Sequence, residues 1–286
     1  MIALTAMSRT DRFLLAGVMG DPVMHSRSPK LHNYWLAKYG LTGAYVPLAI
    51  AREHLRAGLR ALPALGFSGC NLTIPHKEAA LKIVDKVDPL ARRIGAVNCV
   101  VVATDGKLEG QNHDAFGYIE SVREAQPNWR ADSGPIVVIG AGGGARAVLV
   151  GLTDQGAREI RLVNRTLARA KALANELGGP ITALSWEQRE HALEDAAMLI
   201  NATNQGMVGE PPLDLALDCL PMSALVSDIV YIPRETALIA AARKRGNPTV
   251  NGLGMLLHQA RPAFQAWFGI MPEVEPELRA KIEATT

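Results

Sequence analysis

Short apolar runs alternate along the chain with longer segments in which apolar residues recur every three or four positions. Strands and amphipathic helices produce these two patterns, so the alternation predicts an α/β fold. In the first part of the chain we expect strands at 13–20, 44–50 and 69–74, a hairpin at 96–110, and helices at 28–40, 52–66, 76–85 and 114–125. The first helix is expected to begin with Ser28 as its cap and Pro29 in its first turn. The Asp105-Gly106 pair predicts the hairpin turn, and the hairpin makes this a mixed sheet.

After a loop at 127–135, the pattern becomes a regular series of strands and helices. A strand, a glycine turn and a helix fill 135–156, with further strands expected at 159–166, 180–186, 196–207, 224–231 and 248–251, and helices at 167–178, 236–246 and 252–269. Repeated units of strand, helix and strand form parallel sheets. This part is therefore predicted to be a Rossmann-type, doubly wound domain.

Composition and charge limit the class of protein. A length of 286 residues suggests about two domains. The 30 basic and 28 acidic residues leave a net charge of +2 without a basic block, and aromatics make up 5%, so we expect no nucleic-acid partner. No uncharged apolar segment reaches the roughly 18 residues that a membrane span needs. Residues 1–11 are expected to be a loose leader, and the 3 cysteines lack metal or redox spacing, which favours a cytoplasmic location.

A glycine turn in the second part predicts a dinucleotide site. Gly140, Gly142 and Ala145 follow a strand directly and open a helix. Gly140 permits the tight turn, Gly142 lets the backbone approach a pyrophosphate, and Ala145 keeps the helix close to the strand. The helix N-terminus then offers free amides to the phosphates. The alternative is a glycine-rich turn without a ligand.

The end of the next strand favours NADP over NAD. An NAD site usually has a carboxylate there for the ribose diol. This chain has Asn164, Arg165 and Thr166 instead, with Arg169 one turn later. A guanidinium can bind a 2′-phosphate with two hydrogen bonds, whereas a carboxylate would repel it. The alternative is that both arginines are solvated surface charges.

Polar residues also gather at predicted strand ends and loops elsewhere in the chain. They include serines at 26 and 28, Thr73, Lys77, Asn98, Asn112, Asp114 and Gln259. Each has an ordinary structural alternative: Asn98 can be a turn residue, Asp114 a helix N-cap, and Lys77 a solvated surface lysine. Together, these side chains would suit a small ligand that carries several hydroxyl groups.

The chain resembles the shikimate dehydrogenase family over residues 17–269. The resemblance is carried by nine motifs in order: S-x-S-P, N-x-T-x-P-x-K, G-A-V-N, N-x-D-x-x-G, G-A-G-G-x-x-R, N-R-T, I-N-A-T, D-x-x-Y-x-P-x-x-T and N-G-x-G-M-L-x-x-Q. It implies an enzyme that reversibly reduces 3-dehydroshikimate to shikimate with NADP, in aromatic amino acid biosynthesis. It also implies a substrate-binding domain at 12–113, completed by 252–286, and an NADP-binding domain at 114–251.

The resemblance assigns roles residue by residue. Lys77 and Asp114 match the catalytic acid–base pair, with Lys77 donating the proton during reduction. The substrate binders would be Ser26 and Ser28 at the carboxylate, Tyr231 near that end, and Thr73, Asn98 and Gln259 at the ring hydroxyls. The cofactor binders would be Gly140, Ala141, Gly142, Gly143, Gly144, Ala145, Asn164, Arg165, Thr166, Arg169, Thr203, Gly252 and Met255. No metal is expected.

Two questions stay open in the sequence. His113 stands where the family commonly has threonine, and this difference bears on substrate preference. A quinate or aminoshikimate dehydrogenase would need the same machinery, because the substrates differ by one ring group. A relative that only senses nucleotides is a further alternative, against which Lys77 and Asp114 argue. The chain could be a monomer or a homodimer.

Overall fold

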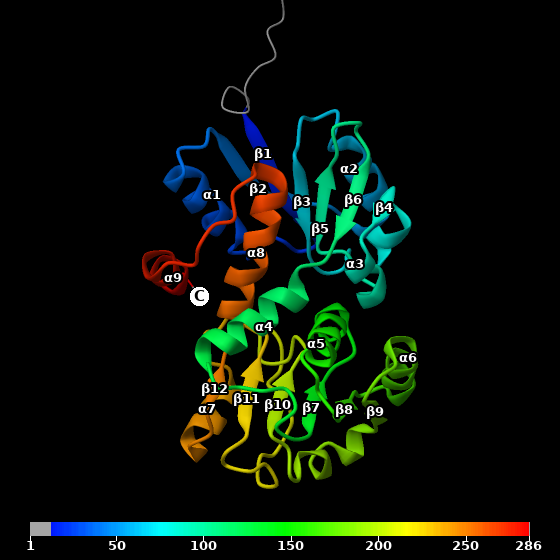
Figure 1. Cartoon of the computed structure of the whole chain (residues 1–286), viewed down its shortest axis with the longest axis vertical. Helices are drawn as coiled ribbons and strands as arrows, with labels where there is room; N and C mark the ends of the chain where they lie inside the picture. The colour runs from blue at the N-terminus through cyan, green and yellow to red at the C-terminus, as the bar shows by residue number, and fades with distance from the viewer. Residues whose placement is uncertain (1–12, 286) are drawn as a thin grey trace, which may run out of the picture. The chain divides into compact units, whose positions relative to one another are not determined.

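Two six-stranded sheets form, one in each of the two units into which the chain divides (Figure 1). The computed structural model describes residues 13–285, so the expected leader at 1–11 lies outside the described residues. Within that range, unit 1 comprises residues 13–113 and Ala260–Thr285, and unit 2 comprises Asp114–Gln259. In this division the chain returns to unit 1 after Gln259.

The sheet of unit 1 is mixed, as its hairpin predicted. Its strands are β1 (Leu14–Gly20), β2 (Gly43–Ala49), β3 (Gly69–Leu72), β4 (Lys86–Val87), β5 (Cys99–Val102) and β6 (Leu108–Gln111), in the order β2-β1-β3-β5-β6-β4. β1 pairs in parallel with β2 and β3, whereas β5 is antiparallel to both of its neighbours, β3 and β6. Gly106 lies in the β5–β6 turn with φ +80°, a backbone conformation that glycine adopts easily.

The helices of unit 1 are α1 (Ser28–Lys38), α2 (Leu55–Ala61), α3 (Pro89–Ile94), α9 (Pro276–Glu283) and the last part of α8 (Leu253–Phe268). Apolar side chains of α2 and α3 pack with those of β3 and β5 in one core cluster. Aromatic rings from α1, β2 and α8 form another buried group. In it, the Trp267 indole N–H donates to the Val100 carbonyl at 2.9 Å.

Unit 2 has the predicted parallel, doubly wound sheet. Its strands are β7 (Ile136–Ile139), β8 (Ile160–Val163), β9 (Ile181–Leu184), β10 (Met198–Asn201), β11 (Leu225–Asp228) and β12 (Thr249–Val250), all parallel, in the order β12-β11-β10-β7-β8-β9. Its helices are α4 (Asp114–Ala125), α5 (Gly143–Asp154), α6 (Leu167–Leu177), α7 (Ala237–Arg245) and the first part of α8. The winding direction reverses between β7 and β10, where such folds bind nucleotides.

Glycines let α4 approach the start of α8 closely. A Cβ atom added at Gly117 would lie 2.5 Å from the Gln259 Cβ and 2.8 Å from the Met255 carbonyl oxygen. One added at Gly254 would lie 2.2 Å from the Ser121 hydroxyl. These contacts give a physical reason for the glycines of the N-x-D-x-x-G and N-G-x-G-M-L-x-x-Q motifs.

Two helices expected in unit 1 are only partly confirmed. The helix expected at 52–66 is a short 3₁₀ turn followed by α2, which ends before Pro63 because proline lacks the N–H that a continuing helix needs. Within 76–85, only Ala79–Lys82 is helical, as a 3₁₀ turn. There the backbone N–H groups of Ile83 and Val84 both donate to the Ala80 carbonyl, and Asp85 already bonds to β6 through the Leu108 carbonyl.

Three smaller features also differ from the sequence predictions. The cap of α1 is Arg27, and Ser28 is the first residue inside the helix, so the predicted serine cap is wrong. Helix α3 is capped by the Asp88 side chain, which accepts from the Ala91 backbone N–H at 2.8 Å, and no element was predicted there. Helix α9 was not predicted either.

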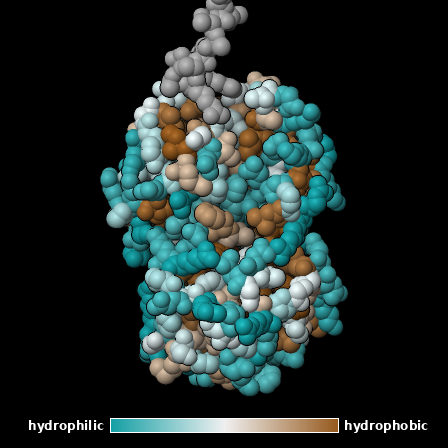
Figure 2. Space-filling model, viewed as in Figure 1, coloured by the Kyte–Doolittle hydropathy of each residue, from teal (hydrophilic) through white to brown (hydrophobic). Residues whose placement is uncertain are grey.

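Among residues 13–285, no helix is long and apolar enough to cross a membrane. Polar residues dominate the face shown in Figure 2, and apolar ones occur there in separate patches. Cys70 and Cys99 are fully buried, as expected of small core residues, and burial raises the pKa of both thiols. They are unbridged, as is the exposed Cys219.

Candidate active site

The predicted substrate residues of unit 1 lie at one edge of its sheet. The segment with Ser26 and Ser28 follows β1, and the segment with Thr73 and Lys77 follows β3, which runs parallel to β1. Asn98 directly precedes the antiparallel β5, so it lies at the same edge. Because parallel strands end at a common edge, the topology gathers residues that are far apart in the sequence.

The loop after β1 places both serines. The Ser26 hydroxyl accepts a hydrogen bond from the Ser28 backbone N–H at 3.3 Å, so Ser26 supports the start of α1 from outside the helix. Ser28 is buried, whereas Ser26 is half-buried. Thr73 is held by its backbone N–H, which donates to the Met19 carbonyl at 2.9 Å. Its methyl group packs so tightly that a Cβ added at Gly20 would lie 2.3 Å away.

Asn98 joins the start of β5 to the chain that follows β6. It is buried, and its Oδ1 accepts from the His113 backbone N–H at 2.8 Å. Nearby, the Asn112 side chain donates to the Ala96 carbonyl at 2.9 Å. The ring of His113 forms a hydrogen bond of 3.1 Å with the Gln111 side chain. His113, the residue before Asp114, is thus held by Asn98 through its backbone and by Gln111 of β6 through its ring.

Lys77 is half-buried in the turn after β3. Its carbonyl accepts from the Val97 backbone N–H at 2.8 Å, which fixes the backbone of Lys77 beside the residue before Asn98. The preceding His76 is fully buried, and its Nε2 lies 2.8 Å from the Ile50 carbonyl oxygen. A backbone hydrogen bond of Lys77 and a side-chain contact of its neighbour His76 therefore hold this turn in place.

In unit 2, the glycine turn joins β7 to α5 as predicted. Gly140 has φ +111°, and an added Cβ would lie 2.7 Å from the Thr203 methyl group, so only glycine fits there. Gly142 is the N-cap of α5, and a Cβ added there would meet nothing within 4 Å. Ala145 is fully buried against the sheet. The backbone at Gly142 is therefore open to a ligand, as a pyrophosphate site requires.

The other members of this turn continue the same pattern. Ala141 is buried, and Gly143 and Gly144 are half-buried in the first turn of α5. A Cβ added at Gly144 would lie 2.8 Å from the Ile229 side chain, so this glycine lets α5 pack against the segment after β11.

The segment after β8 presents cationic groups beside the glycine turn. Arg169 donates through Nε to the Ala141 carbonyl at 3.0 Å, which ties the start of α6 to the turn. Asn164 donates to the Thr166 carbonyl at 3.0 Å and so shapes the loop. Arg165 is exposed, and among the residues described it has no carboxylate partner. These residues fit an anionic 2′-phosphate better than a ribose diol.

A buried carboxylate, not singled out by the sequence analysis, organises the ends of β10 and β11. Asp228 accepts from the Asn201 amide at 3.0 Å, the Val230 backbone N–H at 2.9 Å and the Thr236 hydroxyl at 2.7 Å. Burial raises the pKa of Asp228, and these hydrogen bonds oppose the rise. Asn201 in turn accepts from the Thr203 hydroxyl at 2.7 Å. Members of this network belong to the motifs I-N-A-T and D-x-x-Y-x-P-x-x-T. These two motifs were the sequence signal that could have identified it.

The remaining predicted cofactor residues lie after β12. A Cβ at Gly252 would lie 2.1 Å from the Ile229 carbonyl oxygen, so only glycine permits this approach to the segment that carries Tyr231. Tyr231 is half-buried, and Met255 is buried in the first turn of α8.

Asp114 and Gln259 both belong to unit 2 and lie on two helices in contact. Asp114 is the first residue of α4 and only 4% exposed. Gln259 is buried on α8, beside Gly117, and its amide donates to the Leu256 carbonyl at 3.0 Å. The close approach of α4 and α8 therefore places Gln259 beside Gly117, which follows Asp114 by about one turn of α4.

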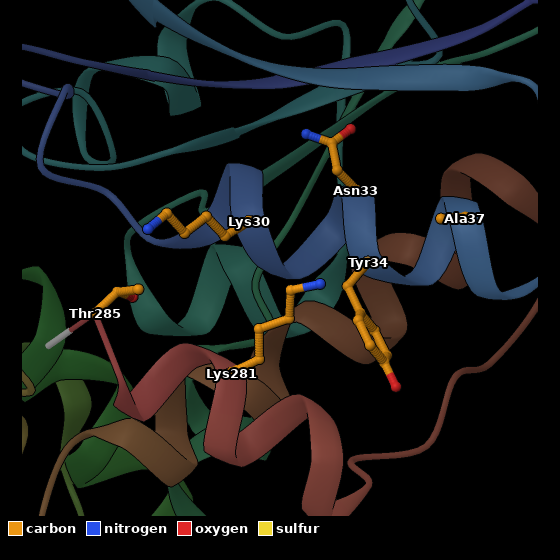
Figure 3. Close-up of a pocket in the computed structure, with 6 residues that line it drawn as sticks. All are labelled: Lys30, Asn33, Tyr34, Ala37, Lys281 and Thr285. Atoms are coloured by element: carbon orange, nitrogen blue, oxygen red, sulfur yellow. The ribbon is translucent and has the colours of Figure 1, made fainter.

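Unit 1 also has a hollow of about 400 Å³, and Figure 3 shows the residues that line it. Four of these residues belong to α1, namely Lys30, Asn33, Tyr34 and Ala37. The others are Lys281 of α9 and Thr285, which follows α9. The Lys281 ammonium lies 5.4 Å from the centre of the Tyr34 ring. None of the residues predicted for substrate or cofactor lines this hollow.

Models of known protein families match three parts of the chain. The shikimate dehydrogenase substrate binding domain matches residues 18–100, shikimate/quinate 5-dehydrogenase matches 123–209, and the shikimate 5′-dehydrogenase C-terminal domain matches 252–276. These segments include most of the residues discussed above.

Individual proteins are similar over nearly the whole length. Shikimate dehydrogenase (NADP(+)) of Paramagnetospirillum magneticum is 57% identical over 266 residues, which cover 93% of this chain and 96% of the relative. A shikimate 5-dehydrogenase of Thermus thermophilus, solved with NADP(H) and shikimate, is 36% identical with a TM-score of 0.83, covering 96% of this chain and 98% of the other. A quinate dehydrogenase of Corynebacterium glutamicum, solved with NAD, is 31% identical with a TM-score of 0.85 and the same coverage, 96% and 98%. With this fold and this degree of identity, the chain belongs to the shikimate dehydrogenase family.

Proposed function

We propose that this enzyme reversibly reduces 3-dehydroshikimate to shikimate with NADP, as a step of aromatic amino acid biosynthesis. The observation that carries the proposal is the 57% identity to a relative named as an NADP(+)-dependent shikimate dehydrogenase. The open backbone at Gly142 and the exposed Arg165 support it, because both suit a phosphorylated dinucleotide.

The residues of unit 2 are proposed to hold the cofactor. The glycine turn from Gly140 to Ala145 would hold the pyrophosphate with backbone amides at the start of α5. Asn164, Arg165, Thr166 and Arg169 would surround the 2′-phosphate, and Thr203, Gly252 and Met255 would border the rest of the dinucleotide. When bound, the cofactor would donate a hydride in its reduced form and accept one in its oxidised form.

The residues of unit 1 are proposed to hold most of the substrate. The hydroxyls of Ser26 and Ser28 can donate to the substrate carboxylate, with Tyr231 of unit 2 near the same end. Thr73 and Asn98, together with Gln259 of unit 2, would bind the ring hydroxyls. The hydrogen bond from the His113 backbone N–H to Asn98 Oδ1 fixes the orientation of the Asn98 amide group, with its oxygen towards His113.

Lys77 and Asp114 are proposed as the acid–base pair. Reduction of a ring ketone leaves negative charge on oxygen, and a donor within hydrogen-bond reach must supply a proton. The Lys77 ammonium would donate this proton in reduction and accept it back in oxidation. Asp114 would orient the ammonium and the substrate hydroxyl through hydrogen bonds.

A second candidate function is oxidation of quinate with NAD. The similarity to the quinate dehydrogenase of Corynebacterium glutamicum, at 31% identity, favours it. The absence of a carboxylate in the Asn164-Arg165-Thr166 segment argues against NAD as the preferred cofactor. A cytoplasmic location and a monomeric or homodimeric state complete the proposal.

An absorbance assay of the reduced nicotinamide tests the proposal directly. The purified enzyme is given shikimate or quinate with NADP or NAD, in all four combinations. We expect the highest kcat/KM for shikimate with NADP. A higher value for quinate with NAD would support the second candidate. Nucleotide binding without turnover on either substrate would identify a sensing protein and refute both candidates.

A further inference from the structure

We infer that Tyr45, which lies outside the predicted site, is a positioning residue that sets the substrate affinity of unit 1 through Asn71 and Ser28. The inference rests on the proposed function, because Ser28 and Asn98 are assigned to the substrate there. It concerns a residue that touches the recognition side chains and not the substrate itself.

The backbone of Tyr45 is fixed from the side of β2 that has no neighbouring strand. β2 is an edge strand, and α1 covers this edge with Asn33. The Asn33 amide donates to the Tyr45 carbonyl at 2.9 Å, and the Tyr45 backbone N–H donates to Asn33 Oδ1 at 2.9 Å. This pair of hydrogen bonds replaces the strand partner that an edge residue lacks.

The ring of Tyr45 is held by its aromatic neighbours. It stacks on the His32 ring, with centroids 4.2 Å apart and planes at 9°, and the Trp267 ring centre lies 5.9 Å away. Tyr45 is 1% exposed and His32 fully buried. With the backbone and the ring both fixed, the hydroxyl has one defined position.

The hydroxyl of Tyr45 takes part in a directed chain of hydrogen bonds. It donates to Asn71 Oδ1 at 2.7 Å, and Asn71 Nδ2 donates to the Asn98 carbonyl at 3.0 Å. The second bond settles the orientation of the Asn71 amide, so its oxygen must face Tyr45. Tyr45 therefore gives its only proton to Asn71, and burial raises the pKa of the phenol, which keeps that proton bound.

Ser28 completes this chain on its outer side. The Ser28 side chain lies beside the Tyr45 hydroxyl and opposes the rise in the phenol pKa, as a hydrogen-bond donor to that oxygen would. Because the Tyr45 proton is committed to Asn71, Ser28 must be the donor and Tyr45 the acceptor. The phenol thus holds the Ser28 hydroxyl in a defined orientation until a substrate carboxylate competes for its proton.

The chain consequently links two kinds of substrate contact. Ser28 is proposed for the carboxylate, and Asn98 is proposed for a ring hydroxyl. The Asn98 carbonyl receives both the Asn71 amide and the Leu72 backbone N–H, at 3.0 and 2.8 Å. Removing the Tyr45 hydroxyl would leave a buried acceptor at Asn71 without its donor and release Ser28. Both effects act on substrate binding, whereas the proton transfer by Lys77 involves neither residue.

The test compares two buried tyrosines. Tyr45→Phe removes one phenol hydroxyl in unit 1. Tyr118→Phe removes another in unit 2, where the hydroxyl donates to Ser227 at 3.2 Å in a buried setting. For Tyr45→Phe we expect KM for shikimate to rise roughly two- to tenfold, with kcat and KM for NADP unchanged. For Tyr118→Phe we expect KM for shikimate to stay at the wild-type value.

Two further variants keep the inference testable. Asn71→Ala breaks the same chain without touching the aromatic stack and should raise KM for shikimate if Tyr45→Phe does not fold. Combining Tyr45→Phe with Ser28→Ala should raise KM less than the product of the single effects, because Tyr45 acts partly through Ser28.

An unchanged KM for shikimate in folded Tyr45→Phe, or in Asn71→Ala where Tyr45→Phe does not fold, would overturn the inference. So would equal effects in the two tyrosine variants. A wild-type enzyme without shikimate turnover would instead refute the proposed function, so the two failures are distinguishable.

Discussion

Arg165 is the residue on which cofactor choice should depend most. It is exposed after β8 and has no carboxylate partner in the described part of the chain, so its guanidinium can bind a 2′-phosphate. Arg165→Ala should weaken NADP binding by about 1.5–3 kcal/mol, the range for a hydrogen bond to a charged group. NAD binding should change little. Calorimetric titration of both cofactors measures the two effects.

Arg158→Ala is the matched control for Arg165→Ala. Arg158 is another exposed arginine of unit 2, paired at 3.3 Å with Asp132 and outside the predicted site. This variant should bind both cofactors as the wild type does. Equal losses of NADP and NAD affinity in Arg165→Ala would contradict the 2′-phosphate assignment.

His32 should make the folded protein sensitive to acid. It is fully buried, neither of its ring nitrogens has a hydrogen-bond partner among residues 13–285, and burial lowers its pKa to about 3. In the unfolded chain, His32 binds a proton near pH 6.5, so above this pH neutral His32 makes its full contribution to the free energy of unfolding. As the pH falls towards 3, this contribution decreases by about 1.4 kcal/mol per pH unit.

His32→Phe keeps an aromatic ring beside Tyr45 and removes the titrating group. Melting temperatures between pH 7.5 and 5 should therefore fall less steeply for this variant than for the wild type. The other titrating groups are shared, so the difference in slope reports His32 alone. Parallel slopes would show that His32 does not contribute.

At the scale of elements, two glycines in the turn between β7 and α5 have different roles: Gly140 is needed for folding, and Gly142 is proposed for cofactor binding. Gly142→Ala places a methyl group where nothing lies within 4 Å, at φ −98°, which alanine adopts without strain. The variant should keep the wild-type melting temperature and lose NADP affinity, because the methyl group would occupy the space of the pyrophosphate. Thermal unfolding with and without NADP measures both quantities.

Gly140→Ala is the contrasting variant in the same turn. Gly140 has φ +111°, and its added Cβ would lie 2.7 Å from the Thr203 methyl group and 3.0 Å from the Ala202 carbonyl oxygen. This variant should lose stability even without cofactor, by about 1–3 kcal/mol. The binding assignment of Gly142 would fail if Gly142→Ala bound NADP normally.

The parallel sheet of unit 2 was predictable from sequence because each strand, turn and helix has a local pattern. The segment at 76–85 was not, because its backbone is directed into the sheet by a hydrogen bond from Asp85 to the Leu108 carbonyl, 23 positions away. Pro63 was a local signal that the helix expected at 52–66 would stop early.

The candidate site shows the same limit. Its residues were assigned largely through motifs. A motif identifies the functional side chains but not the residues that form hydrogen bonds with them. Tyr45 and Asn71 are 26 positions apart, and Asn201 and Asp228 are 27 apart. Only the fold brings each pair within hydrogen-bonding distance, so no local pattern could reveal the supporting networks.

At the scale of the whole molecule, the chain builds unit 1, then unit 2, and returns to unit 1 within α8. Most proposed substrate residues belong to unit 1, and all proposed cofactor residues belong to unit 2. The proposed acid–base pair takes Lys77 from unit 1 and Asp114 from unit 2. The central claim is that the reaction depends on Lys77 as its proton donor and acceptor.

The most direct test is steady-state oxidation of shikimate with NADP by Lys77→Ala, after a check that the variant is folded. Lys86→Ala serves as the control, because this lysine of unit 1 is 71% exposed and lies on β4. The control should show wild-type rates. Lys77→Ala should lower kcat by about 10²–10⁴-fold, the usual contribution of general acid–base catalysis, with a much smaller change in KM. A near-normal kcat with a large rise in KM would contradict the catalytic role and make Lys77 a substrate-binding residue.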